Sequence, residues 1–102
     1  MFRLVYGGDL LTIRLRDYSA TFATREKARE VIASVPGGRI ADVDVDGVLC
    51  SPSFLAELMV QLTKNSDLTV TTTDRTMADK VERLSSQLGL TGKISVHFAV
   101  SA

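Results

Sequence analysis

The stretch of residues 40–48 constrains the fold more than any other, because its side chains alternate between apolar and acidic from Ala41 to Asp46. The letters ADVDVDG at residues 41–47 show the pattern. A period of two is that of a β-strand with one buried face and one open face. The sequence therefore predicts a strand that buries its valines and carries Asp42, Asp44 and Asp46 on its open face.

A sharp turn and a helix start follow this strand. Gly47 permits a backbone bend that a side chain would resist, and we expect the apolar run at residues 48–50 to continue inward. Ser51 followed by Pro52 predicts a helix start, with a capping hydroxyl and then proline at the first helical position. The apolar residues after it recur at helical spacing: Phe54, Leu55, Leu58, Met59 and Leu62. Open α/β sheets place their binding sites at such strand-to-helix turns.

The three aspartates also match the first half of a calcium-binding EF-hand loop. The full loop requires a glutamate at its twelfth position, and that position is Ser53 here. Valines separate the aspartates, and no helix pattern precedes them. We therefore expect no metal site, and expect the aspartates to face water or arginines.

The rest of the chain predicts further strands and helices in alternation. Residues 2–6 and 10–16 read as a β-hairpin around Gly7-Gly8-Asp9. Thr21 or Thr24 should cap a helix that ends at Pro36-Gly37-Gly38, and Thr73 or Asp74 should cap another that ends at Gly89. Alternating residues predict the last two strands, over 68–72 and 94–100.

The two-faced strands predict helices mainly on one face of the sheet, because strands covered on both faces would be apolar throughout. With right-handed crossovers that step in one direction, we expect an α/β fold in a single domain, 1–102. It should have an N-terminal β-hairpin, then βα repeats, in a five-stranded mixed sheet of order 1-2-3-4-5. On the open face, Arg14 or Arg16 should pair with Asp42 or Asp44. The alternative is that this face docks a partner or a second copy.

Composition excludes several functional classes. Twelve basic residues balance twelve acidic ones without a basic patch, so we expect neither nucleic acid nor a membrane surface as partner. A single cysteine, Cys50, fits a reducing cytoplasm, and the first residues lack a signal-peptide pattern. His97 is the only histidine, and Cys50 should be buried and inert. With no glycine-rich phosphate loop either, we expect no enzyme and no cofactor.

Four short motifs follow one another along the chain: Phe22-Ala23-Thr24-Arg25-Glu26, Ala28-Arg29, Asp44-x-Asp46-Gly47-Val48 and Ser51-Pro52-Ser53-Phe54-Leu55-x-Glu57-Leu58. In this order they resemble the STAS-like domain family of small bacterial proteins, which is similar to STAS domains such as the antagonists of anti-sigma factors. The resemblance runs from about residue 10 to the end. It implies the hairpin and βα-repeat fold, and a non-catalytic regulatory switch that binds a histidine-kinase-like ATPase.

The resemblance also implies a phosphorylated serine at the start of the second helix, which would be Ser53 or Ser51. STAS antagonists carry Asp-Ser-Ser-Gly at this turn, whereas this chain lacks the acidic residue and the glycine. Helix capping is the alternative role for both serines. The expected partner-binding residues are Thr24, Arg25, Asp46, Ser51 and Ser53, in a monomer or weak dimer. A second functional class stays open: a small-ligand or nucleotide-binding domain that uses the second helix's amino end as an anion site.

Overall fold

A computed structural model describes residues 10–35, 39–64 and 66–99. The predicted strand over 2–6, its hairpin turn and the helix stop at 36–38 lie outside these ranges. The described elements are, in order, β2 (Leu10–Arg14), a 3-10 turn η1 (Leu15–Asp17), β3 (Thr21–Phe22), α2 (Arg25–Ala33), β4 (Arg39–Asp44), β5 (Leu49–Cys50), α3 (Pro52–Leu62), β6 (Leu68–Thr72), α4 (Arg75–Gln87) and β7 (Ile94–Phe98).

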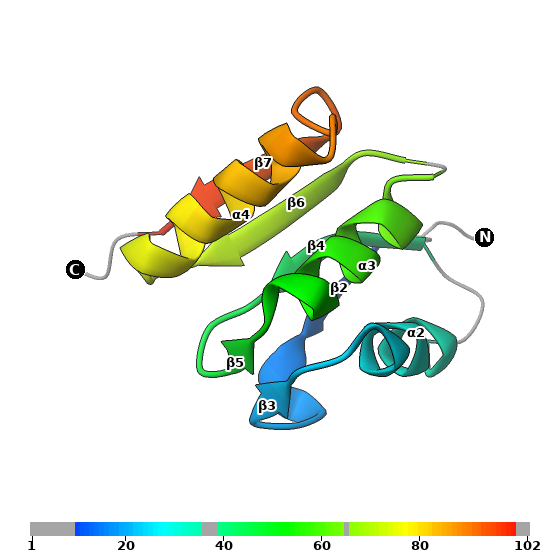
Figure 1. Cartoon of the computed structure of the whole chain (residues 1–102). Helices are drawn as coiled ribbons and strands as arrows, with labels where there is room; N and C mark the ends of the chain where they lie inside the picture. The colour runs from blue at the N-terminus through cyan, green and yellow to red at the C-terminus, as the bar shows by residue number, and fades with distance from the viewer. Residues whose placement is uncertain (1–9, 36–38, 65, 100–102) are drawn as a thin grey trace.

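The main sheet has four parallel strands in the order β2-β4-β6-β7. Helices connect successive strands, as parallel neighbours require, and Figure 1 shows all three helices on one side of the sheet. The α/β class and the sequential order of these four strands are confirmed. The predicted five-stranded mixed sheet is wrong for the described residues, where every strand pair is parallel.

A second, two-stranded parallel sheet joins β3 to β5 and was not predicted. Two-residue strands are too short to show a period of two in the sequence. The strand predicted over 10–16 ends at Arg14 instead, and Leu15 begins a 3-10 turn. This turn puts Leu15 fully into the core and leads the chain toward β3.

Side chains cap the starts of the three helices. The Thr24 hydroxyl accepts a hydrogen bond from Lys27 N at 3.1 Å, and the Ser51 hydroxyl accepts one from Phe54 N at 3.1 Å. Asp74 Oδ1 accepts from Thr76 N at 2.9 Å. The predicted caps are thus confirmed, with Thr24 and Asp74 chosen from the two pairs of candidates.

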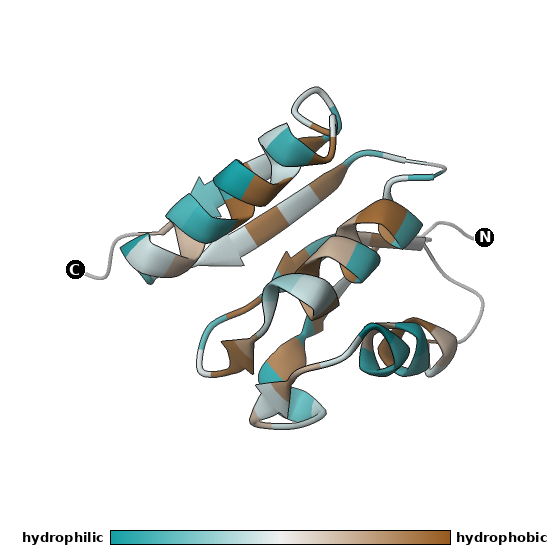
Figure 2. Cartoon of the chain, in the orientation of Figure 1, coloured by the Kyte–Doolittle hydropathy of each residue, from teal (hydrophilic) through white to brown (hydrophobic). Residues whose placement is uncertain are grey.

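The hydrophobic core fills the space between the helices and the sheet. Hydropathy colouring shows the apolar side of each helix turned toward the strands (Figure 2). Val43, Phe54 and Val81 are completely buried there. Phe22 of β3 lies against Phe54, with ring centroids 4.8 Å apart, so the small sheet packs on the same core as α3.

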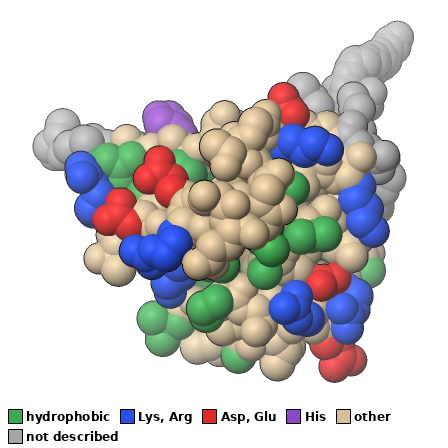
Figure 3. Space-filling view, turned by 45° about the horizontal axis from the view of Figure 1, so that its top comes forward, with side chains coloured by type: hydrophobic (Ala, Val, Ile, Leu, Met, Phe, Trp, Pro, Cys, Tyr) green, Lys and Arg blue, Asp and Glu red, His purple; other side chains and the backbone are tan. Residues whose placement is uncertain are grey.

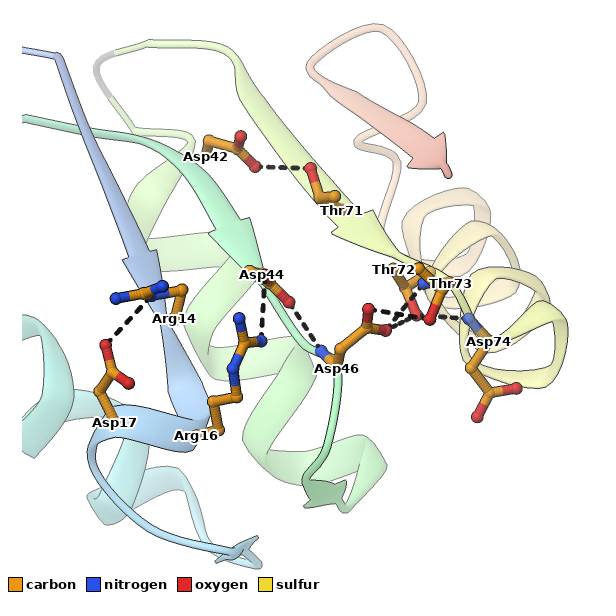
Figure 4. A network of polar contacts seen from close by, with 10 residues as sticks. All are labelled: Arg14, Arg16, Asp17, Asp42, Asp44, Asp46, Thr71, Thr72, Thr73 and Asp74. Atoms are coloured by element: carbon orange, nitrogen blue, oxygen red, sulfur yellow. Dashed lines mark hydrogen bonds and ion pairs between the residues drawn. The ribbon is translucent and has the colours of Figure 1, made fainter. Parts of the chain in front are cut away.

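Polar side chains lie on the face of the main sheet that the described helices leave uncovered (Figures 1 and 4). Asp42 Oδ1 accepts a hydrogen bond from Thr71 Oγ1 at 2.9 Å, and Arg16 Nη1 lies 3.1 Å from Asp44 Oδ2. Arg14 is in register with Asp44 but forms its ion pair with Asp17. The predicted Arg–Asp pairing is confirmed. Such exposed pairs contribute roughly 0–1 kcal/mol each.

Candidate functional site

The candidate site lies where the parallel strands end and the helices begin. Backbone hydrogen bonds from Leu49 N to Ala20 O (3.0 Å) and from Ser51 N to Phe22 O (2.9 Å) hold β5 beside β3 at this end. The chain passes from β3 into α2 and from β5 into α3. The amino ends of two helices therefore start from one small sheet (Figure 1).

The structure gives the two candidate serines different environments. Ser51 is half-buried, and its hydroxyl both caps α3 and donates to Ala23 O at 2.8 Å. It therefore ties the start of α3 to the segment that leads into α2. Ser53 is exposed, and within the described residues its hydroxyl takes part in no hydrogen bond. Of the two serines, Ser53 is therefore the one whose hydroxyl can be modified without breaking a hydrogen bond of the described fold.

Arg25 lies at the first position of α2 and takes part in a cluster between α2 and α3. Its guanidinium lies 3.5 Å from Glu57 Oε1, and that of Arg29 lies 3.4 Å from Glu57 Oε2. A hydrogen bond from Gln61, together with both arginines and against the effect of burial, lowers the pKa of Glu57. Glu57 is one turn beyond Ser53, so this cluster and Ser53 share a face of α3.

The Asp46 carboxylate forms its hydrogen bonds with Thr72 and Thr73 rather than with either serine. Its Oδ1 accepts from Thr73 N at 2.7 Å and from Thr72 Oγ1 at 2.8 Å, and its Oδ2 accepts from Thr73 Oγ1 at 2.9 Å (Figure 4). Partial burial raises the pKa of Asp46, but these hydrogen bonds and the charge of Arg16 outweigh it and lower the pKa. Asp46 thus fastens the end of β4 to the loop before α4.

The bend after Asp46 depends on Gly47, which has a φ of +77°. That left-handed conformation favours glycine. A side chain there would meet Arg16 Cδ at 3.7 Å, which is ordinary contact. The backbone conformation, rather than lack of space, therefore explains the glycine predicted for this turn.

An apolar groove runs between the β3–β5 sheet and the first turns of α4. Its volume is about 460 Å³, and Phe22, Val48, Cys50 and Met77 supply apolar lining. Leu49, at its rim, is 74% exposed. The expectation that residues 48–50 all run inward is therefore wrong for Leu49. In a strand, the residue between two buried ones faces the other way.

Cys50 is buried in this groove wall, as predicted, and burial raises its pKa to about 11. A thiol with that pKa stays protonated at neutral pH and is a poor nucleophile. Lys80 reaches across from α4, with Nζ 3.3 Å from Cys50 O. The groove therefore has an apolar floor, with polar groups at its edge.

The described residues contain no group of three or more His, Cys, Asp or Glu side chains that could hold a metal ion. The carboxylates of Asp42 and Asp46 instead accept hydrogen bonds from threonines, and that of Asp44 forms an ion pair with Arg16. His97 is exposed on β7 and is not among the residues that line the groove.

Sequence reasoning located the turn but missed the groove. The groove depends on the pairing of β3 with β5 and on the approach of α4, which are contacts between distant segments. The local signal that was available is Leu49, which has the opposite strand parity to its buried neighbours Val48 and Cys50.

No helix within the described ranges is long and apolar enough to cross a membrane. No protein-family model, curated protein or solved structure significantly matches this chain.

Proposed function

We propose that this chain is a non-catalytic protein-interaction module of the STAS type, which works in the cytoplasm. The partner docks at the apolar groove and the adjoining starts of α2 and α3. One observation carries the proposal: Leu49 stands 74% exposed at the rim of an apolar groove. The leucine is continuous with the groove, and contiguous exposed apolar surface marks interaction sites, whereas a single exposed leucine would not.

The resemblance to STAS-like domains supports a histidine-kinase-like ATPase as the partner. Ser53 is the better candidate for a regulatory phosphate, because its hydroxyl is exposed and Ser51 is engaged in capping. A phosphate would add about −1.5 to −2 charges near the positive end of α3. The fold would tolerate this charge, while a partner seated on the neighbouring apolar surface would not.

The geometry gives less support to a nucleotide or other anion at this place. The Ser51 hydroxyl already accepts from Phe54 N at the start of α3. The groove is also lined by the carboxylate-bearing Asp74, which caps α4 and would repel a phosphate. The apolar floor and the carboxylate both favour a protein surface as occupant.

The first test compares Leu49→Ser with a matched control, Leu88→Ser. Leu88 is a leucine that is 37% exposed at the far end of α4. Both variants serve as bait in a pulldown from native lysate, and proteins retained by wild type and Leu88→Ser but lost by Leu49→Ser are identified. We expect a histidine-kinase-like ATPase among them, with affinity lowered at least about tenfold by Leu49→Ser, or roughly 1.4 kcal/mol. Equal capture by both variants would place docking elsewhere.

The second test addresses the switch with Ser53→Asp and its control Ser53→Ala. We expect both variants to melt within a few degrees of wild type, because the Ser53 side chain is exposed and its hydroxyl forms no hydrogen bond within the described residues. The aspartate should change the affinity for the captured partner by about tenfold, and the alanine should not. Unfolding of Ser53→Asp would show that this serine is structural, and unchanged affinity would refute the switch.

A further inference from the structure

Among the described strands, β7 has a neighbour along one edge only, which leaves its outer edge to pair with another strand. β7 ends the described sheet and pairs only with β6. Lys93 O accepts from Leu68 N and Ala99 N donates to Thr72 O, both at 2.9 Å, so the odd-numbered residues turn their backbone groups toward β6. The even-numbered residues, Ile94, Val96 and Phe98, therefore point their N–H and C=O groups outward.

These outward groups have few partners in the described chain. The N–H of Ile94 donates to Leu90 O at 3.0 Å. Within the described ranges, no backbone bond satisfies the outward groups of Val96 or Phe98. Isolated edge strands usually carry a lysine, a proline or a bulge that blocks pairing. The sequence of β7, ISVHF, contains no charged Lys, Arg, Asp or Glu and no proline.

The pattern of apolar and polar side chains along β7 is the same in both chain directions. Ile94 is buried, Val96 packs against the core, and Phe98 lies under the Arg75 guanidinium, 4.6 Å from its ring centroid. Between them, Ser95 and His97 are exposed on the open face. The order apolar-polar-apolar-polar-apolar is symmetric about Val96.

We propose that a second copy of this chain pairs antiparallel with β7, about a two-fold axis at Val96. The two Val96 residues then donate to each other's carbonyl, and Phe98 N–H of each copy donates to Ile94 O of the other. These are the outward groups, so the backbone parity fits. Ile94 faces the second copy's Phe98 on the helix side, and Ser95 faces its His97 on the open side, as cross-strand pairs do.

The rim of α4 beside β7 is also complementary to itself. Arg75, Asp79 and Glu82 line a hollow of about 250 Å³ together with Val96 and Phe98. Acidic and basic side chains stand beside hydrophobic ones on the face shown in Figure 3. The two-fold axis places the two α4 helices antiparallel, so Arg75 of one copy approaches the acidic end of the other's rim. An interface in which one patch meets itself is the usual form of a dimer.

The register is tested by disulfide trapping. Val96→Cys places two thiols on the axis, with Cα atoms about 5.5 Å apart, within disulfide reach. Ser95→Cys is the control, because its own copies lie diagonally, about 7–8 Å apart. We expect oxidation to give a covalent dimer for Val96→Cys and little for Ser95→Cys or wild type, whose Cys50 is buried. Equal trapping at both positions would overturn the register.

Sedimentation analysis from about 10 μM to 1 mM tests the dimer itself. We expect reversible dimerisation that Arg75→Glu weakens at least about threefold, and that Arg75→Glu with Glu82→Arg restores, since both residues are exposed on α4. A wild-type monomer throughout this range would overturn the proposal and leave the edge to a strand of another protein. The proposal would also be overturned by a dimer that Arg75→Glu does not weaken and that Val96→Cys does not trap in preference to Ser95→Cys.

Discussion

Replacing Ser51 with alanine should destabilise the domain far more than replacing Ser53 in the same helix turn. Ser51→Ala removes the cap bond from Phe54 N and the bond to Ala23 O. The cap contributes about 1 kcal/mol. The second bond contributes about 0.5 kcal/mol, the low end of its range, because water can replace it at a half-buried site that solvent still reaches. The sum is about 1.5 kcal/mol.

Urea and thermal unfolding measure this difference directly. A domain of this length unfolds with an entropy of roughly 0.2 kcal/mol/K, so Ser51→Ala should melt about 7 °C lower than wild type. Ser53→Ala should stay within about 0.5 kcal/mol, because alanine is at least as good a helix former as serine. Equal midpoints for the two variants, or a larger loss at Ser53, would refute the division into a structural and an accessible serine.

Two further predictions concern the aspartate row. The lowered pKa of Asp46 means that its ionised form stabilises the fold above the unfolded value near 3.9, and that this stability is lost as the pH falls through the folded value. Asp46→Asn should thus be about 1 kcal/mol less stable at pH 7, with the gap closing below about pH 4 in acid titrations followed by circular dichroism. Calcium at millimolar concentration should leave the melting temperature unchanged, because hydrogen bonds occupy Asp42 and Asp46 and Ser53 stands at the twelfth loop position; a saturable rise would contradict this.

Local patterns predicted most of the main sheet and the helix starts. Alternation identified β4, β6 and β7, and the open face followed from the polar parity of Asp42 and Asp44. Caps were predictable because a hydroxyl or carboxylate before a helical stripe has few other roles. Ser51 followed by Pro52 is the clearest case, since both residues lie where the pattern placed them.

The features that were missed depend on contacts between distant segments. The pairing of β3 with β5 joins residues that lie far apart in the chain, and each strand is too short for a periodic signal. The 3-10 turn at Leu15 interrupts an alternation that continues to Arg16 in the sequence. Tertiary packing decides such cases, because burying Leu15 in the core outweighs one more residue of strand.

The hydrogen bonds of Asp46 change how a switch at this turn would work. We expected Asp46 to bind a partner together with Thr24, Arg25 and the two serines, but its carboxylate forms hydrogen bonds with Thr72 and Thr73. What remains for a partner beside α3 is apolar surface, at Leu49 and the groove behind it. A charge at Ser53 would therefore act mainly by making that surface costly to bury, since a buried charge without a counterion opposes binding. An arginine on the partner opposite Ser53 would reverse the sign, so the direction of the Ser53→Asp effect reports which side chain the partner places there.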